Sequence, residues 1–146
     1  MLHATDQEVF SLTAFTSLVS NHLTPIDTVH SILRLRNGTY GIFNISLGTE
    51  FKTAFDIEVV TDRGSVTVQA DQVICITKDK DGKRMRECTE IGYDNGVRAE
   101  VDAFARSIAG AAADERGTPE QALADLRLIY TMLESGEQGG AVRFLT

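Results

Sequence analysis

The sequence lacks several features that would define its class at once. It has no tryptophan, only two prolines and only two cysteines in 146 residues. No stretch approaches the roughly 18 consecutive apolar residues of a membrane helix. The N-terminus also lacks the charged start and apolar run of a secretory signal. We therefore expect a cytoplasmic protein of one domain, a size at which about 70% of the unfolded surface is buried.

Positive charge is also scarce. Fourteen lysines and arginines stand against 21 acidic residues, which gives a formal net charge of −7. Nucleic acids favour a basic patch because their phosphates are negative. The most basic segment, residues 78–86, alternates with acidic residues, as solvated turns do. The composition therefore argues against nucleic acid as a partner.

The cysteines are too few for a disulfide framework or a closed zinc site. If Asp81-Gly82 forms a two-residue turn, Cys75 and Cys88 lie opposite each other across a hairpin. We expect two reduced thiols that pack side by side on one face. No carboxylate or thiol lies at a metal-ligand spacing from any of the three histidines, which are His3, His22 and His30. No metal site is predicted.

Most of the chain reads as short strands separated by turn residues. Asn37-Gly38 and Asp81-Gly82 predict two-residue hairpin turns, and Asp62-Arg63-Gly64 predicts a three-residue turn with a left-handed glycine. The expected strands are Leu12–Ser20, Thr28–Arg36, Thr39–Leu47, Ala54–Thr61, Ser65–Gln69, Gln72–Thr77 and Arg86–Glu90.

A two-residue turn at Asn37-Gly38 fixes which residues face each other. Each face of the hairpin then carries apolar pairs, although a sheet with one solvated face alternates more cleanly. One face must cover the helices, and the other needs a partner, so we expect self-association as a homodimer. The expected pairs are Leu35–Tyr40 and Leu33–Ile42 on one face, and Ile32–Phe43 and His30–Ile45 on the other.

Two helices and a closing strand are expected in the last third of the chain. Thr118-Pro119-Glu120-Gln121 is typical of a helix start, with Thr as the N-cap and Pro in the first turn. Gly136 and Gly139-Gly140 end this helix, and residues 141–145 can return as a strand. The expected core stripes are Val97, Val101, Phe104 and Ile108 in the first helix, and Ala122, Leu126, Ile129, Met132 and Leu133 in the second. The predicted class is α+β, an open, mostly antiparallel β-sheet with two C-terminal helices packed on one face.

This order resembles the C-terminal domain of the glucose–fructose oxidoreductase, inositol dehydrogenase and MocA-like family. The likeness runs from about Thr13 to Leu145 and rests on the hairpin Leu33–Gly41, the turn Asp62–Val68, the helix carrying Glu100–Phe104, and Pro119–Asp125 with Ser135. The resemblance implies the second domain of a two-domain NAD(P)-dependent enzyme. In such enzymes the sheet lines the substrate site and makes the dimer.

The catalytic parts of that family are missing from the sequence. No Gly-x-Gly-x-x-Gly follows a strand, so the phosphate cradle of a dinucleotide site is absent. Neither Pro25 nor Pro119 follows a lysine, so the family's Glu-Lys-Pro segment is absent too. His3 and Asp6 match the family's His-x-x-Asp spacing and are at most weak remnants of a catalytic segment. The alternative is a loosely ordered start over residues 1–11.

No other residue is assigned a catalytic, cofactor-binding or metal-binding role. In the family, positions such as Glu50, Lys52 and Asp56 can approach the substrate, but we expect a solvated loop for them here.

Two hypotheses follow. In the first, the chain is the substrate-side and dimerisation domain of an NAD(P)-dependent oxidoreductase, either cut from a longer protein or encoded as a truncated form. It is then inactive alone, because NAD or NADP would be held by the missing Rossmann domain. The alternative is a stand-alone binding or scaffold module that self-associates through its sheet face.

Overall fold

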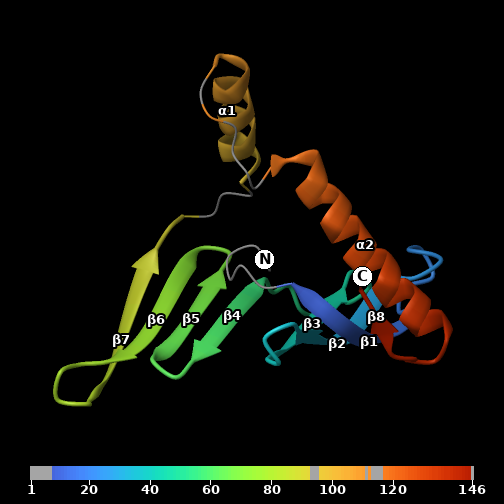
Figure 1. Cartoon of the computed structure of the whole chain (residues 1–146), viewed down its shortest axis with the longest axis horizontal. Helices are drawn as coiled ribbons and strands as arrows, with labels where there is room; N and C mark the ends of the chain where they lie inside the picture. The colour runs from blue at the N-terminus through green and yellow to red at the C-terminus, as the bar shows by residue number, and fades with distance from the viewer. Residues whose placement is uncertain (1–7, 93–95, 111, 113–116, 146) are drawn as a thin grey trace. The chain divides into compact units, whose positions relative to one another are not determined.

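The computed structural model describes residues 8–92, 96–110, 112 and 117–145, which divide into two compact units (Figure 1). The first unit comprises residues 1–51 and 114–146, and the second comprises residues 52–113. Each unit contains a four-stranded antiparallel sheet and one helix. The predicted α+β class and the antiparallel pairing are therefore confirmed, with the strands shared between two sheets.

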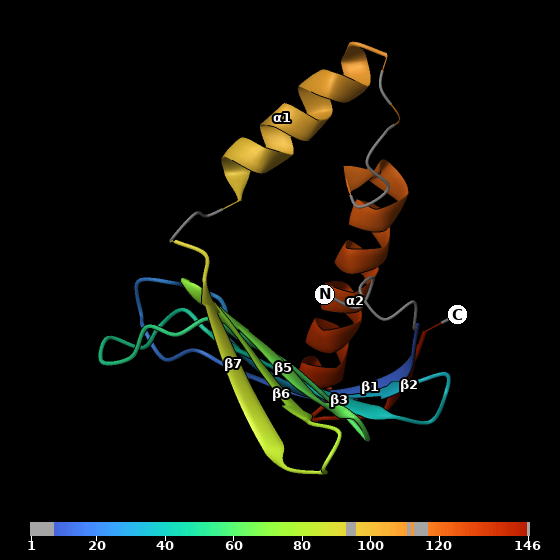
Figure 2. The ribbon, with the colours of Figure 1, turned by 90° about the vertical axis from the view of Figure 1, so that its left-hand side faces the viewer.

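The first unit contains β1 (Val9–Ser17), β2 (Thr28–Leu35), β3 (Tyr40–Ser46), β8 (Arg143–Phe144) and α2 (Pro119–Glu137). Its sheet has the order β3-β2-β1-β8, and α2 packs on one face of it along β1 (Figure 2). The second unit is a meander of β4 (Asp56–Thr61), β5 (Gly64–Gln69), β6 (Gln72–Lys78) and β7 (Arg84–Glu90), followed by α1 (Val97–Ile108). All predicted strands and both helices are present, and β1 begins three residues earlier than Leu12.

The hydrophobic core lies in the first unit, between its sheet and α2. Ser31, Leu33 and Leu35 are buried on β2, while the intervening residues are exposed. The cluster comprises Val9, Leu12, Ala14, Leu33 and Met132, with Val29, Phe43, Leu128 and Leu145 packed against it. In the second unit no described residue is buried, including the apolar stripe of α1. Among the described residues, neither helix is long and apolar enough to cross a membrane.

Helix α2 begins as predicted but buries a different side. Thr118 Oγ1 accepts a hydrogen bond from the Gln121 backbone N–H at 3.3 Å, which caps the helix. Of the predicted core stripe, Met132 is buried, but Leu126 is 61% exposed and Ile129 is 49% exposed. The side of α2 that packs on the sheet carries Met132 together with Leu128 and Ser135, which were not part of the predicted stripe.

The small residues at the end of α2 explain this orientation. Strand β8 pairs with β1 only at Ser11 and Leu12, so the edge of β1 is open at Ala14. There the Ser135 hydroxyl accepts from the Ala14 N–H at 2.8 Å, and it donates to the Ala141 carbonyl at 2.7 Å. At Gly136 an added Cβ would lie 2.5 Å from the Thr16 side chain, so the helix can come this close only with a glycine. Ser135 thus replaces a neighbouring strand.

The register predicted for the β2–β3 hairpin is wrong by one residue. Leu33 pairs with Gly41, and Ile32 pairs with Ile42. The turn is a three-residue loop, because the Gly38 N–H donates to the Leu35 carbonyl at 3.0 Å and Gly38 has φ +88°. A type I turn followed by a left-handed glycine uses Asn-Gly as readily as the two-residue turn does.

The β6–β7 hairpin departs from the prediction in the same way. Cys75 pairs with Glu87, and Cys88 pairs with Ile74, so the two thiols lie on opposite faces of the sheet. Here the Gly82 N–H donates to the Asp79 carbonyl at 3.0 Å, with φ +79° at Gly82. The prediction that the thiols pack side by side is therefore wrong.

The β4–β5 turn is shorter than predicted. Gly64 pairs with Thr61, which leaves a two-residue loop of Asp62 and Arg63. The glycine is required for a different reason: a Cβ at Gly64 would collide with the Ile76 carbonyl oxygen on β6.

We predict that Ser135→Ala destabilises the first unit. The substitution leaves the buried Ala14 N–H without its acceptor, and an unsatisfied buried donor costs about 1–3 kcal/mol. Urea unfolding followed by circular dichroism measures the change. Ser107→Ala on α1 is the matched control, and equal stability losses in the two variants would contradict the role assigned to Ser135.

Candidate functional site

The face of the first sheet that points away from α2 carries large apolar side chains. We call it the open face. In the observed register Ile32 lies between Thr13 and Ile42, and His30 lies between Phe15 and Asn44. The exposed fractions are 59% for Phe15, 53% for Ile32, and 70% for both Tyr40 and Ile42. Both faces of this sheet therefore carry apolar side chains, as predicted. The residues that pair across β2 and β3 differ from the predicted pairs.

The polar groups of the open face are mostly neutral. His30 Nδ1 and Asn44 Oδ1 lie 3.2 Å apart, and the hydroxyls of Thr28 and Ser46 lie 2.7 Å apart. The Arg34 guanidinium lies over the Phe10 ring, 5.7 Å from its centroid. At the outward positions of β1, β2 and β3 there is no carboxylate. The Thr28 hydroxyl is buried, so the polar groups that the face presents beside its apolar side chains are the exposed His30–Asn44 pair and Tyr40, which can donate and accept hydrogen bonds.

A buried aspartate, which the sequence analysis did not single out, organises the loop beside this face. Asp27 is 5% exposed, and its carboxylate accepts hydrogen bonds from the Val19 N–H at 2.9 Å and the Ser20 N–H at 2.7 Å. The Thr28 hydroxyl donates to it at 2.9 Å. Removal from water raises the pKa of Asp27, but these hydrogen bonds outweigh that effect and hold the pKa below its usual value.

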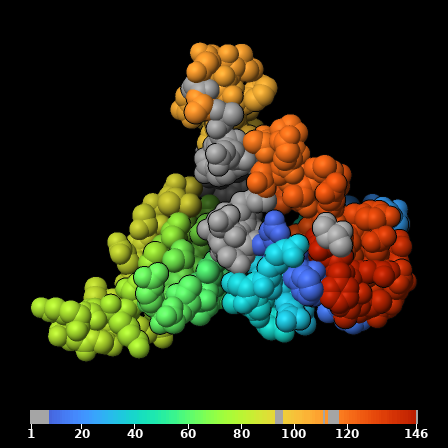
Figure 3. All heavy atoms as spheres, viewed as in Figure 1, coloured from blue at the N-terminus to red at the C-terminus, as the bar shows by residue number. Residues whose placement is uncertain are grey.

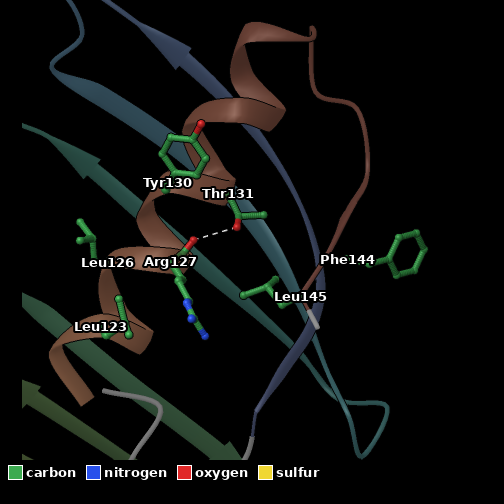
Figure 4. Close-up of a pocket in the computed structure, with 7 residues that line it drawn as sticks. All are labelled: Leu123, Leu126, Arg127, Tyr130, Thr131, Phe144 and Leu145. Carbon is green, nitrogen blue, oxygen red and sulfur yellow. Dashed lines mark hydrogen bonds between the residues drawn. The ribbon is translucent and has the colours of Figure 1, made fainter. Parts of the chain in front are cut away.

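A second surface lies on the other side of the sheet, between α2 and β8 (Figure 4). We call it the α2–β8 depression. The Leu145 side chain points towards Arg127 in it, whereas the Phe144 ring points away. Thr131 Oγ1 donates to the Arg127 backbone carbonyl at 2.7 Å, within the helix. The lining residues are Leu123, Leu126, Arg127, Tyr130, Thr131, Phe144 and Leu145.

The other residues considered from the sequence do not converge on a site. His3 and Asp6 lie outside the described residues. Glu50 belongs to the first unit and Lys52 and Asp56 to the second, and all three are exposed. Within the described ranges, no group of three or more His, Cys, Asp or Glu could hold a metal ion. The residues considered from the sequence are therefore not brought together at one place in the described part of the chain.

The fold defines a domain of helices and antiparallel sheets, which comparison with known proteins places in one family. Residues 2–144 match the model of the Gfo/Idh/MocA "oxidoreductase family, C-terminal alpha/beta domain". The chain belongs to this family.

Individual relatives agree with this assignment and are much longer. Dehydrogenase FPY6 of Fusarium mangiferae is 34% identical over 145 residues, which are 99% of this chain and 42% of that protein. An oxidoreductase of Thermotoga maritima has a TM-score of 0.72 at 24% identity, over 94% of this chain and 38% of its own. An oxidoreductase of Agrobacterium radiobacter, in complex with NAD+, L-tartaric acid and magnesium, has a TM-score of 0.74 at 17% identity, over 94% and 43%. The chain thus spans less than half the length of these relatives.

We predict that Asp27→Asn loses stability at neutral pH and much less in acid. A carboxylate with a lowered pKa stabilises the fold above its unfolded pKa of about 3.9, and this contribution disappears as pH falls through the folded value. Urea unfolding of both proteins between pH 7 and pH 2.5 measures the difference. A stability gap that stays constant over this range would contradict the hydrogen-bonded carboxylate.

Proposed function

We propose that the chain is the substrate-side and dimerisation domain of an NAD(P)-dependent oxidoreductase and has no dehydrogenase activity by itself. The observation that carries this proposal is the family match over residues 2–144, combined with coverage of only 42% of the Fusarium relative. The NAD+ bound to the Agrobacterium relative supports a nicotinamide cofactor for the parent enzyme. No Gly-x-Gly-x-x-Gly occurs in these 146 residues to hold it.

The dimerisation part of the proposal rests on the open face. Its exposed apolar residues form a contiguous patch over three strands, and monomeric proteins seldom leave such a patch in water. Hydroxyl and amide groups that both donate and accept are self-complementary under a twofold axis. A second copy of the chain therefore fits this face. We further propose that the homodimer is cytoplasmic.

The alternative is a stand-alone scaffold module that self-associates through the same face. The exposed apolar residues of the open face support this alternative equally. The two hypotheses differ in whether a nucleotide-binding domain docks on the chain.

We predict that the purified chain neither binds NADH nor reduces NAD+ or NADP+. Hydride transfer requires a cofactor and substrate held at near-attack distance, and a proton-relay base. NADH fluorescence titration measures binding. Absorbance at 340 nm, with myo-inositol, glucose and L-tartrate as trial substrates, measures turnover. Measurable NADH production without added protein would refute the prediction.

We predict that Ile42→Asp weakens the dimer by about 100-fold or more, because each copy would bury an unpaired carboxylate in the centre of the interface. Sedimentation equilibrium gives the dissociation constant. Val60→Asp is the matched control, because Val60 is 71% exposed and lies on the second unit. A wild-type chain that is monomeric at micromolar concentration would contradict dimerisation.

A further inference from the structure

The loop between β1 and β2 (blue, at the right of Figures 1 and 3) and the residues after β3 are held by the same residue, Asp27. Its carboxylate accepts hydrogen bonds from the N–H groups of Val19 and Ser20, at 2.9 Å and 2.7 Å. Its backbone carbonyl accepts a hydrogen bond from the Leu47 N–H at 2.9 Å. One residue of the first unit therefore anchors two segments that lie far apart in the sequence.

The two segments also meet directly at Gly48. A Cβ added to this glycine would overlap with the Asp27 carboxylate and would lie 2.9 Å from the Val19 Cβ. Gly48 is not among the glycines with positive φ, so the lack of space, and not the backbone conformation, requires a glycine here. The segment after β3 can therefore lie this close to the loop only while residue 48 has no side chain.

The anchor is buried, whereas the segments that it holds lie outside the hydrophobic core. Asp27 is 5% exposed, and the Thr28 hydroxyl that donates to it lies 2.7 Å from the Ser46 hydroxyl. No residue of 18–26 or 47–48 belongs to the apolar cluster between the first sheet and α2. A segment that is held by hydrogen bonds and not by the core can open locally while the core stays folded.

We propose that residues 18–26 and 47–48, which we call the anchored segments, open and close together as one cooperative element with Asp27 as their shared anchor. Asp27 directly follows residue 26, so it moves when the loop opens, and the Leu47 N–H then loses its acceptor. The element changes the conformation of one end of the first sheet without unfolding the core, which is the behaviour of lids and binding loops. This inference goes beyond the proposed function and does not depend on it.

Residue-resolved amide hydrogen exchange of the wild-type chain, followed by NMR, is the first test. We expect the N–H groups of Val19, Ser20 and Leu47 to have protection factors that agree within about twofold, because one opening event exposes all three. These values should be lower than that of the Ala14 N–H, which is bonded to Ser135 in the core. A clearly different value for Leu47 would overturn the proposal, because the segments would then open separately. Equality of all four values would overturn it too, because opening would then require unfolding of the core.

Gly48→Ala tests the coupling between the anchored segments. The added methyl group displaces the Asp27 carboxylate, although it removes no hydrogen bond of Val19 or Ser20 directly. We expect these two N–H groups to exchange about tenfold faster or more, as for the loss of a hydrogen bond to a charged group. Gly41→Ala is the matched control, because the atom nearest to its added Cβ is 4.0 Å away. Faster exchange confined to residues 47–48 would contradict the shared anchor.

Asp27→Asn removes the charge of the anchor and should speed exchange at the same three N–H groups together, again by about tenfold or more. Asp79→Asn is the matched control, because the Asp79 carboxylate accepts two backbone hydrogen bonds within the β6–β7 turn. It should leave the anchored segments unchanged. An effect of Asp27→Asn on one anchored segment alone would refute the cooperative element. Protection of the Ala14 N–H shows that each variant keeps its core, and the wild-type comparison decides the question if a variant fails to fold.

Discussion

The contact between Ser135 and the edge of β1 determines how the first unit is built. Strand β8 is too short to cover Ala14, and the serine hydroxyl completes the hydrogen bonding there. This contact fixes the rotation of α2 about its axis, because Gly136 must face Thr16 at the same point. Met132 then enters the core, and the opposite side of the helix is left facing outwards. One residue thus decides which side of α2 is core and which is surface.

The two exposed surfaces of the first unit follow from this orientation and differ in chemistry. The open face carries aromatic and branched residues with neutral hydrogen-bonding groups, so it can pair with itself. The α2–β8 depression carries Arg127, which forms no ion pair with any described residue, and two identical copies of this patch would bring like charges together if they faced each other.

The sequence predicted the elements well and their pairing poorly. Periodicity and the turn residues located every strand and both helices, because these signals are local. Asn37-Gly38 and Asp81-Gly82 are compatible with both two-residue and three-residue loops. A register predicted from them can therefore be wrong by one residue, and such an error assigns side chains to the wrong face of the sheet. Asp27 was not identified, and Ser135 was named only as part of the family resemblance, because the roles of both depend on backbone groups brought close by the fold. Ser135 and Ala14 are 121 residues apart.

In the proposed function, the division of an oxidoreductase into two domains places a strict demand on the surface between them. Hydride transfer requires donor and acceptor within about 3.5 Å, and an error of about 1 Å is costly. A domain that supplies the substrate side must therefore be held rigidly against the domain that holds the cofactor. In the proposed function, α2 is the element of the first unit best held to meet this demand, because Ser135 anchors its C-terminal end to β1 and Met132 packs it on the sheet.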